Sequence, residues 1–392
     1  MSNKFKTYWI SHQILDYLAS ISTTIFINFY IWENTKNISS ILKFNLGLFL
    51  IYPLAVLVGS VLTELLGLKF TQIITKISQA IFVSLLLFLG TSIIQDPLIF
   101  GFLAGLVLGT AFAPVDVIAA KILPDLRLDI NSKIKTGTII AGIIFPPLLS
   151  FLVDIKGSFT APFTTALIVY VLLLIFSIFT SFPPVDGKFN LVEIFKFPGG
   201  NPEKGILLKS AFLSGLKDSI HYSLIGVLTL NFIGSLTSWG WFKLTLSFFS
   251  LVLVLLYKKL KISKQSIISL GFGAVVFLVG SAYFAYDFSL IGIYVYATAT
   301  AIYEVFYGFG ITGTMTRLTD LDVSPKDLTA EYTFFTALFT SIGLVLPIAF
   351  LDYFKLDLQD PMMFLIVVIF IAIVPFTILK VMSKSFYLTH QS

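Results

Sequence analysis

Long apolar runs separated by short polar stretches are the main pattern along this 392-residue sequence. Each run has about the 20 mainly apolar residues that a membrane-spanning helix needs. Six runs lie on each side of a polar stretch at 182–204, which is rich in proline and glycine and carries both charge signs. Such a stretch cannot cross a bilayer. The pattern predicts an all-α, polytopic membrane protein with an N-terminal half at 1–182, a linker at 183–204 and a C-terminal half at 205–392.

The predicted spans follow one another with short connections. The first begins within ten residues of the N-terminus, but it is longer than the core of a signal peptide and contains His12 and Asp16, so we expect a retained helix. The twelve spans are predicted at 8–32, 39–63, 71–94, 98–120, 135–153 and 161–182 in the first half, and at 206–233, 239–257, 266–286, 289–315, 328–351 and 361–382 in the second.

Composition agrees with this assignment and limits the chemistry. Hydrophobic residues make up 57% of the chain and charged residues 12%, against about 25% charged residues in a soluble domain. Cysteine is absent and histidine occurs three times, which excludes disulfides and thiolate metal sites and leaves little for any metal centre. The sequence has no phosphate-binding P-loop, so ATP is not expected as the direct energy source. No cofactor is predicted.

Basic residues fall mostly on one side of the predicted membrane. The connection after the eighth span alone carries four lysines, and Lys76 is grouped with this side. The opposite side has few: Lys36, Lys43, Lys156, Lys243 and Lys355. By the positive-inside rule, both termini and the linker are cytoplasmic and the protein lies in the plasma membrane. The net charge of +5 then reflects topology and contact with anionic lipid, and nucleic acid is not expected as a partner.

A faint internal repeat links the two halves. The fifth span ends PPLLSFLVD at 146–154 and the eleventh ends LPIAFLD at 346–352. The first span carries Ile27-Asn28-Phe29 and the seventh Leu230-Asn231-Phe232 in the corresponding place. The shared offset of about 200 residues predicts a parallel repeat, of the kind in which each half is one copy.

The connection after the second span reads SVLTELLGLK from Ser60 to Lys69. It resembles the motif G-x-L-A-D-R-x-G-R-K between helices two and three of the major facilitator superfamily. The pattern is matched at Leu62, Gly67 and Lys69 and by an acid at Glu64, whereas Ser60, Leu65 and Leu68 depart from it. The resemblance implies the superfamily fold, with twelve helices in two pseudo-symmetric halves, and leaves the substrate open.

The resemblance also implies a gate on the cytoplasmic side, in which the acid of the motif faces the start of helix eleven. Here the eleventh span opens Ser324-Pro325-Lys326-Asp327, a sequence typical of a helix N-terminus, where about half a positive charge resides. We therefore expect contact between Glu64 and residues 325–328 in an outward-facing state. The gating motif comprises Ser60, Glu64, Gly67 and Lys69. The alternative is that Glu64 and Lys69 belong only to a solvated turn and form no gate.

Ionisable side chains inside the predicted spans fall on few helices. A charge at bilayer depth costs several kcal/mol unless it faces protein or water, so these helices should face an internal cavity. The resemblance implies the same four helices as the cavity lining. The residues are His12 and Asp16 on the first span, Asp116 on the fourth, Lys217, Asp218 and His221 on the seventh, and Glu304 on the tenth.

Spacing suggests roles for these residues. His12 and Asp16 are four apart and share a helix face, and His221 shares a face with Lys217 and Asp218. Glu304 lies midway along its span beside Tyr303 and Tyr307, and a carboxyl desolvated at that depth takes up a proton more readily than in water. All are predicted substrate- or proton-binding residues. A structural salt bridge from Lys217 to Glu304 or to Asp16 is the alternative, and Asp116, nearer the cytoplasmic end, favours a structural role.

The function predicted from these features is secondary active transport of a small molecule by alternating access, coupled to protons, in a monomer. The fifth span contains Gly137, Gly142, Pro146 and Pro147, which resembles the helix five of superfamily exporters and favours efflux. Alternatives on the same fold are uptake of a sugar or other nutrient, a lipid flippase and a non-transporting receptor. A membrane enzyme that uses His12 and Asp16 as an acyltransferase-like pair is a further alternative, but no enzymatic activity is predicted.

Overall fold

The computed structural model describes residues 3–121, 124–182, 229–259 and 266–319, with 212, 215, 336 and 338–345. Every secondary-structure element in these ranges is a helix. The predicted all-α class is therefore confirmed. The linker and the seventh, eleventh and twelfth spans lie wholly or largely outside the described residues, so the number of twelve spans and the division at 183–204 stay predictions.

The first half follows the predicted spans closely. Helix α1 (Asn3–Ser20), a π-helical turn η1 (Ile21–Ile25) and α2 (Phe26–Thr35) form the first span without a gap. Helix α3 (Ile38–Leu89) contains both the second and the third span. A 3-10 turn η2 (Gly90–Ile94), α4 (Pro97–Lys121), α5 (Pro124–Lys156) and α6 (Thr160–Phe179) complete the half.

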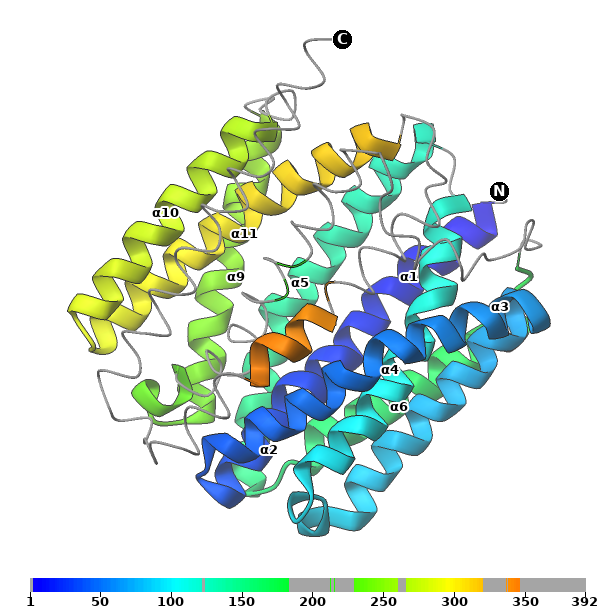
Figure 1. Cartoon of the computed structure of the whole chain (residues 1–392), viewed down its shortest axis with the longest axis horizontal. Coiled ribbons are helices and arrows are strands. Elements are labelled where there is room, and N and C mark those ends of the chain that lie inside the picture. Colours follow the sequence, from blue (N-terminus) through cyan, green and yellow to red (C-terminus); the bar gives the residue numbers. More distant parts are fainter. Residues whose placement is uncertain are drawn as a thin grey trace.

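The described part of the second half consists mainly of three helices, α9 (Leu236–Lys259), α10 (Ser266–Tyr286) and α11 (Leu290–Thr319). They correspond to the predicted eighth, ninth and tenth spans. In Figure 1 the blue to green helices of the first half, α1 to α6, group on one side and the yellow-green to yellow helices of the second half, α9 to α11, on the other. Helices α5 and α9 pack against each other at the boundary.

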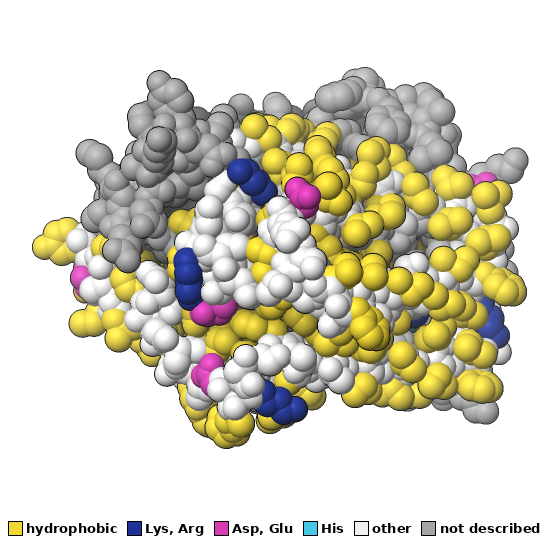
Figure 2. Space-filling model, turned by 90° about the horizontal axis from the view of Figure 1, so that it is seen from below, with side chains coloured by type: hydrophobic (Ala, Val, Ile, Leu, Met, Phe, Trp, Pro, Cys, Tyr) yellow, Lys and Arg dark blue, Asp and Glu magenta, His cyan; other side chains and the backbone are white. Residues whose placement is uncertain are grey.

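The surface is suited to lipid. Within the described ranges, six helices are long and apolar enough to cross a membrane. Large apolar side chains such as Phe88, Leu54 and Phe179 are exposed, at 87%, 53% and 83%. Figure 2 shows yellow side chains over much of one face, with few charged groups among them. A soluble monomer rarely exposes apolar surface on this scale, so the helices form a membrane domain.

Small residues bring α3 and α4 into backbone contact. A Cβ atom added at Gly101 would lie 2.0 Å from the carbonyl oxygen of Phe44, and one added at Gly47 would lie 2.2 Å from that of Leu98. In a bilayer, where apolar side chains gain little by leaving lipid, such close packing is a main source of helix association. The glycines therefore fix how the second and fourth spans pack.

Candidate functional site

The turn of the gating motif lies inside α3, where the second span gives way to the third. Gly67 has φ 78° and ψ 164°, a conformation open essentially to glycine alone. Glu64 is exposed and Lys69 half-buried, while the hydroxyl of Ser60 is buried and donates to the carbonyl oxygen of Val56. The glycine of the motif is thus required by the backbone. The predicted contact of Glu64 with residues 325–328 lies outside the described residues.

Replacing Gly67 by alanine is expected to lower the free energy of unfolding by about 1–3 kcal/mol, because a Cβ atom is strained in this backbone conformation. Nothing lies within 4 Å of that Cβ position, so the loss would come from the backbone and not from a clash. Thermal unfolding in detergent measures it. Alanine at Gly157, also at positive φ (60°) and also with open space around it, is the comparison, since its φ is close to the ordinary left-handed region and the loss there should be smaller.

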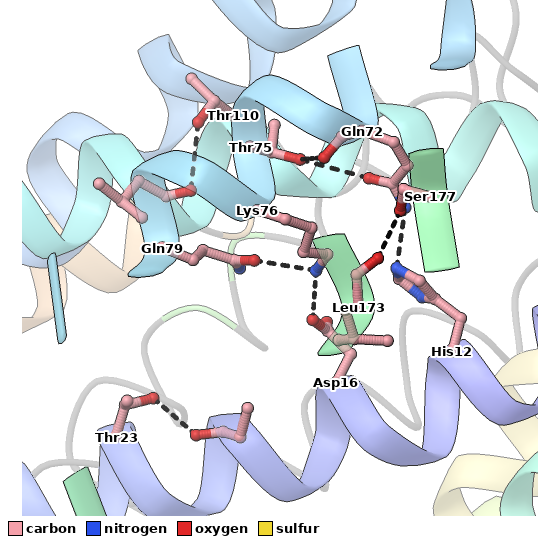
Figure 3. A network of polar contacts seen from close by, with 12 residues as sticks. His12, Asp16, Thr23, Gln72, Thr75, Lys76, Gln79, Thr110, Leu173 and Ser177 are labelled. Atoms are coloured by element: carbon pink, nitrogen blue, oxygen red, sulfur yellow. Dashed lines mark hydrogen bonds and ion pairs between the residues drawn. The ribbon is translucent and has the colours of Figure 1, made fainter. Parts of the chain in front are cut away.

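A buried polar network joins α1 to the second half of α3 (Figure 3). The Lys76 ammonium forms an ion pair with the Asp16 carboxylate and donates to Oε1 of Gln79 at 2.8 Å. The Lys76 side chain is 1% exposed. It was predicted to belong to the cytoplasmic basic residues, and the third span was predicted to carry no charge inside. Both predictions were wrong, because Lys76 lies more than two turns beyond Gly67 and points inward to an acid.

Asp16 and His12 face protein from one side of α1, as their spacing predicted. His12 is fully buried, and its Nε2 lies 3.0 Å from Nε2 of Gln72. The Gln72 amide nitrogen has only protons to offer, so the imidazole nitrogen accepts and the ring proton sits on Nδ1. The ring stacks on Trp9 at 5.8 Å between centroids. His12 is therefore held beside the ion pair by Gln72 and Trp9.

Helix α6 supplies further partners to this network. The ring of Tyr170, itself buried, lies 5.6 Å from the Lys76 ammonium, a distance that allows a cation–π interaction. One level nearer the N-terminus of α1, a hydrogen bond of 3.1 Å joins the hydroxyls of Tyr8 and Ser177. The ammonium thus has a carboxylate, an amide oxygen and an aromatic face as partners. The alternative of a salt bridge between Asp16 and Lys217 is not tested, because Lys217 lies outside the described residues.

The polar face of the third span was visible in the sequence. Thr71, Gln72, Thr75, Lys76 and Gln79 are all buried, and they recur at the three- and four-residue spacing of one helix face. This stripe within an apolar span was the signal that could have identified Lys76 as an internal charge.

Glu304 lies in the middle of α11, and it is exposed, in contrast to the desolvated position that the sequence suggested. Its neighbours Tyr303 and Tyr307 are buried and stack on each other at 4.6 Å between centroids. Tyr303 also stacks on Phe277 of α10 at 4.8 Å. Both tyrosines thus form the packing between α10 and α11, and Glu304 points in another direction.

Glu304 has a basic neighbour that the sequence did not indicate. Electrostatic interactions link it to Lys243 of α9 and to Tyr17 of α1. Lys243 was predicted to lie on the outer side. It is half-buried and comes seven residues after the start of α9 at Leu236, about 10 Å from that end of the helix at 1.5 Å per residue, so its outer placement stays a prediction.

Tyr17 and Lys243 lie at the boundary between the halves. The Tyr17 hydroxyl lies 3.3 Å from the position of a Cβ atom at Gly142 in α5. The hydroxyl of Ser247, one turn after Lys243 in α9, donates to the carbonyl oxygen of Gly142 at 3.4 Å. Groups from α1, α5, α9 and α11 therefore converge at this level, around one carboxylate and one ammonium.

Several predicted site residues are not placed. Asp116 belongs to α4, but its side chain is not among those described, and Lys217, Asp218 and His221 lie outside the described residues. No group of three His, Cys, Asp or Glu that could hold a metal occurs within the described ranges. The roles predicted for these four residues stay predictions.

Comparisons with known proteins add evidence on the fold. No family model matches the sequence, and no curated protein matches it. Solved structures do. The nucleoside transporter NupG is 14% identical, with a TM-score of 0.69 over 97% of this chain and 99% of its own. A POT family transporter in complex with 5-aminolevulinic acid is 11% identical, with a TM-score of 0.73 over 96% of this chain and 95% of its own. Another, in complex with a thioalcohol-conjugated peptide, is 12% identical, with a TM-score of 0.72 over 97% of this chain.

These solved structures are transporters of the major facilitator superfamily, and the similarity extends over almost the whole chain in each case. The resemblance read from residues 60–69 is therefore confirmed by the structure: this chain has the fold of the major facilitator superfamily.

Proposed function

We propose that this protein is a secondary active transporter that moves a small solute across the plasma membrane by alternating access of its two halves. The observation that carries the proposal is the match of 96–97% of the chain to solved transporters of one fold. Charged side chains that face protein inside the spans support it, because a bilayer tolerates such groups at functional positions and rarely elsewhere. The protein acts as a monomer with cytoplasmic termini.

The coupling ion we propose is the proton. The Asp16–Lys76 pair and the neighbouring charges of Glu304 and Lys243 give each half an acid beside a base. An acid that is shielded from water remains charged while its cation is near and takes up a proton when the cation withdraws. Each pair lies within one half, so coupling would require a helix movement inside that half that separates the two charges and shields the acid from water.

The proposed substrate is a small amphiphile, with export favoured by Gly142, Pro146 and Pro147 in α5. Glu304 and Lys243 would offer it one charge of each sign. The structural neighbours include a nucleoside transporter and proteins in complex with 5-aminolevulinic acid or a peptide. These ligands are small molecules with polar groups. Nutrient uptake and lipid flipping remain the alternatives on this fold.

A flux assay in proteoliposomes tests this proposal. We expect that at least one member of a panel of amphiphilic cations, zwitterions, nucleosides and sugars crosses several-fold faster when a proton gradient is imposed, and that an ionophore removes the difference. Liposomes without protein and liposomes with the Glu304→Gln variant are the controls. Binding without flux would indicate a receptor, movement of labelled lipid would indicate a flippase, and chemical conversion of a panel member would indicate an enzyme. Each of these results would contradict the proposal.

A further inference from the structure

The ends of α5 and α9 meet across the boundary between the halves, on the side that the positive-inside rule places outside the cell. Helix α5 ends at Lys156 and α9 begins at Leu236, and the two helices pack against each other (Figure 1). Asp154, the last residue of the repeated sequence PPLLSFLVD, lies at this end of α5. No role was predicted for Asp154 from the sequence.

The first N–H groups of a helix have no acceptor within the helix. At the start of α9, the Ser235 hydroxyl accepts from the N–H of Ser238 at 3.1 Å. The N–H of Thr237 donates to Oδ2 of Asp154 at 2.8 Å. One of these acceptors thus belongs to the residue immediately before α9 and the other to the opposite half. A carboxylate at a helix N-terminus is also favoured by the helix dipole. The contact therefore places the negative charge of Asp154 beside the partial positive charge at the start of α9, across the boundary.

Beneath this contact the boundary is sealed by apolar packing. Trp239 is fully buried, and its ring packs edge-on against Phe29 of α2 at 4.7 Å between centroids. A Cβ atom added at Gly240 would lie 2.6 Å from Cα of Pro147, so α9 lies directly on the α5 backbone. The polar contact is exposed to solvent, whereas Trp239 below it is fully buried. Water therefore has access to the contact before the seal is broken.

We propose that Asp154 is a gating residue, whose carboxylate and the N-terminus of α9 form an outer latch that holds the external side closed. The proposal rests on the alternating access proposed above. The latch uses the same chemistry as that predicted for Glu64 at the opposite side of the membrane, an acid of one half on a helix start of the other. Opening outward separates α5 from α9, exchanges the Thr237 bond for one to water and exposes Trp239.

The absence of cysteine from the sequence allows pairs of spin labels to be introduced directly. An outer pair at Lys156 and Tyr286 and an inner pair at Lys133 and Leu256 use exposed positions in the two halves. Distances are measured by double electron–electron resonance on the full chain in liposomes, without substrate. Asp154→Ala removes the latch, and Asp96→Ala, which removes another exposed acid predicted on the outer side, is the matched control.

With Asp154→Ala, we expect the outer distance to lengthen and the inner distance to shorten together, with a rise in the outward-open population of roughly three- to tenfold, the range for loss of one helix cap. Asp154→Asn keeps an acceptor oxygen without charge and should give a smaller shift, and it serves as the test if the alanine variant does not fold. Asp96→Ala should change neither distance.

Two results would overturn the latch: unchanged distances in both Asp154 variants, or a longer outer distance with no change inside, since local fraying would move only the outer pair. Wild-type distances that respond to pH while the Asp154 variants match wild type would count against the latch alone. Wild-type distances that are fixed under all conditions would count against alternating access itself.

Discussion

Replacing Lys76 by methionine should lower the free energy of unfolding by about 3–5 kcal/mol, the loss typical of removing one partner from a buried ion pair. Methionine fills most of the space of the lysine stem, so the loss would come from charge and not from a cavity. The Asp16 carboxylate would lose its ammonium partner, and Gln79 Oε1 would lose its donor. Thermal unfolding in detergent, followed by tryptophan fluorescence, measures the effect.

Lys69→Met is the matched control, because Lys69 is half-buried near the turn at Gly67. A loss for Lys76→Met no greater than for Lys69→Met would show that the buried pair is not a source of stability. The double variant Asp16→Asn with Lys76→Met removes both charges, and we expect it to regain most of the lost stability, since no buried charge is left uncompensated. If Asp16 carries the proton, the double variant should still move substrate across the membrane, but a proton gradient should not change the rate of that flux.

The sequence was a good guide to the fold for a physical reason. In a bilayer, each backbone N–H and C=O must be bonded within the chain, so an apolar run of spanning length has to be a helix. The described helices follow the predicted spans, and the one glycine that the motif identified, Gly67, is the residue with the glycine-only backbone conformation at the turn of α3.

The partners of the charged residues were not predictable in the same way. Lys76 and Lys243 lie near the ends of their predicted spans, where a long lysine side chain usually extends to the membrane surface. Whether it extends outward or turns inward depends on which face of the helix meets an acid of another helix, here Asp16 for Lys76 and Glu304 for Lys243. That is a property of tertiary packing, which the positive-inside rule does not consider.

The tyrosines beside Glu304 show a limit of a different kind. They were grouped with it because they are neighbours in sequence, but successive residues of a helix point about 100° apart. Tyr303 and Tyr307 therefore share a buried face toward α10, while Glu304 is exposed. Helical spacing separates Tyr303 from Glu304, but Tyr307 is three residues from Glu304 and only about 60° away around the helix. The burial of Tyr307 toward α10 is therefore a property of the packing, which spacing did not contain.

Replacing Glu304 by glutamine is expected to reduce pH-driven flux by roughly 100-fold, the scale for loss of one positioned proton-transfer group. Substrate exchange without a gradient should remain measurable, because exchange needs the binding site but no net proton movement. Glutamine keeps the shape of the side chain and removes its charge. Since Glu304 is exposed, no buried acid is lost, and the free energy of unfolding should change little.

The neighbouring charge of Lys243 makes this prediction specific. If Lys243 held Glu304 ionised in every state, the glutamate could not carry a proton, and Glu304→Gln would affect stability more than coupling. If a helix movement within the second half draws Lys243 away and shields Glu304 from water, the carboxyl takes up a proton in that state and releases it in the other. Flux and exchange are therefore measured on the same proteoliposomes, with Asp96→Asn as a control that removes an exposed acid without an assigned role in gating or coupling. Undiminished pH-driven flux in Glu304→Gln would exclude the coupling role, and a marked loss of thermal stability would assign the residue to a structural ion pair with Lys243.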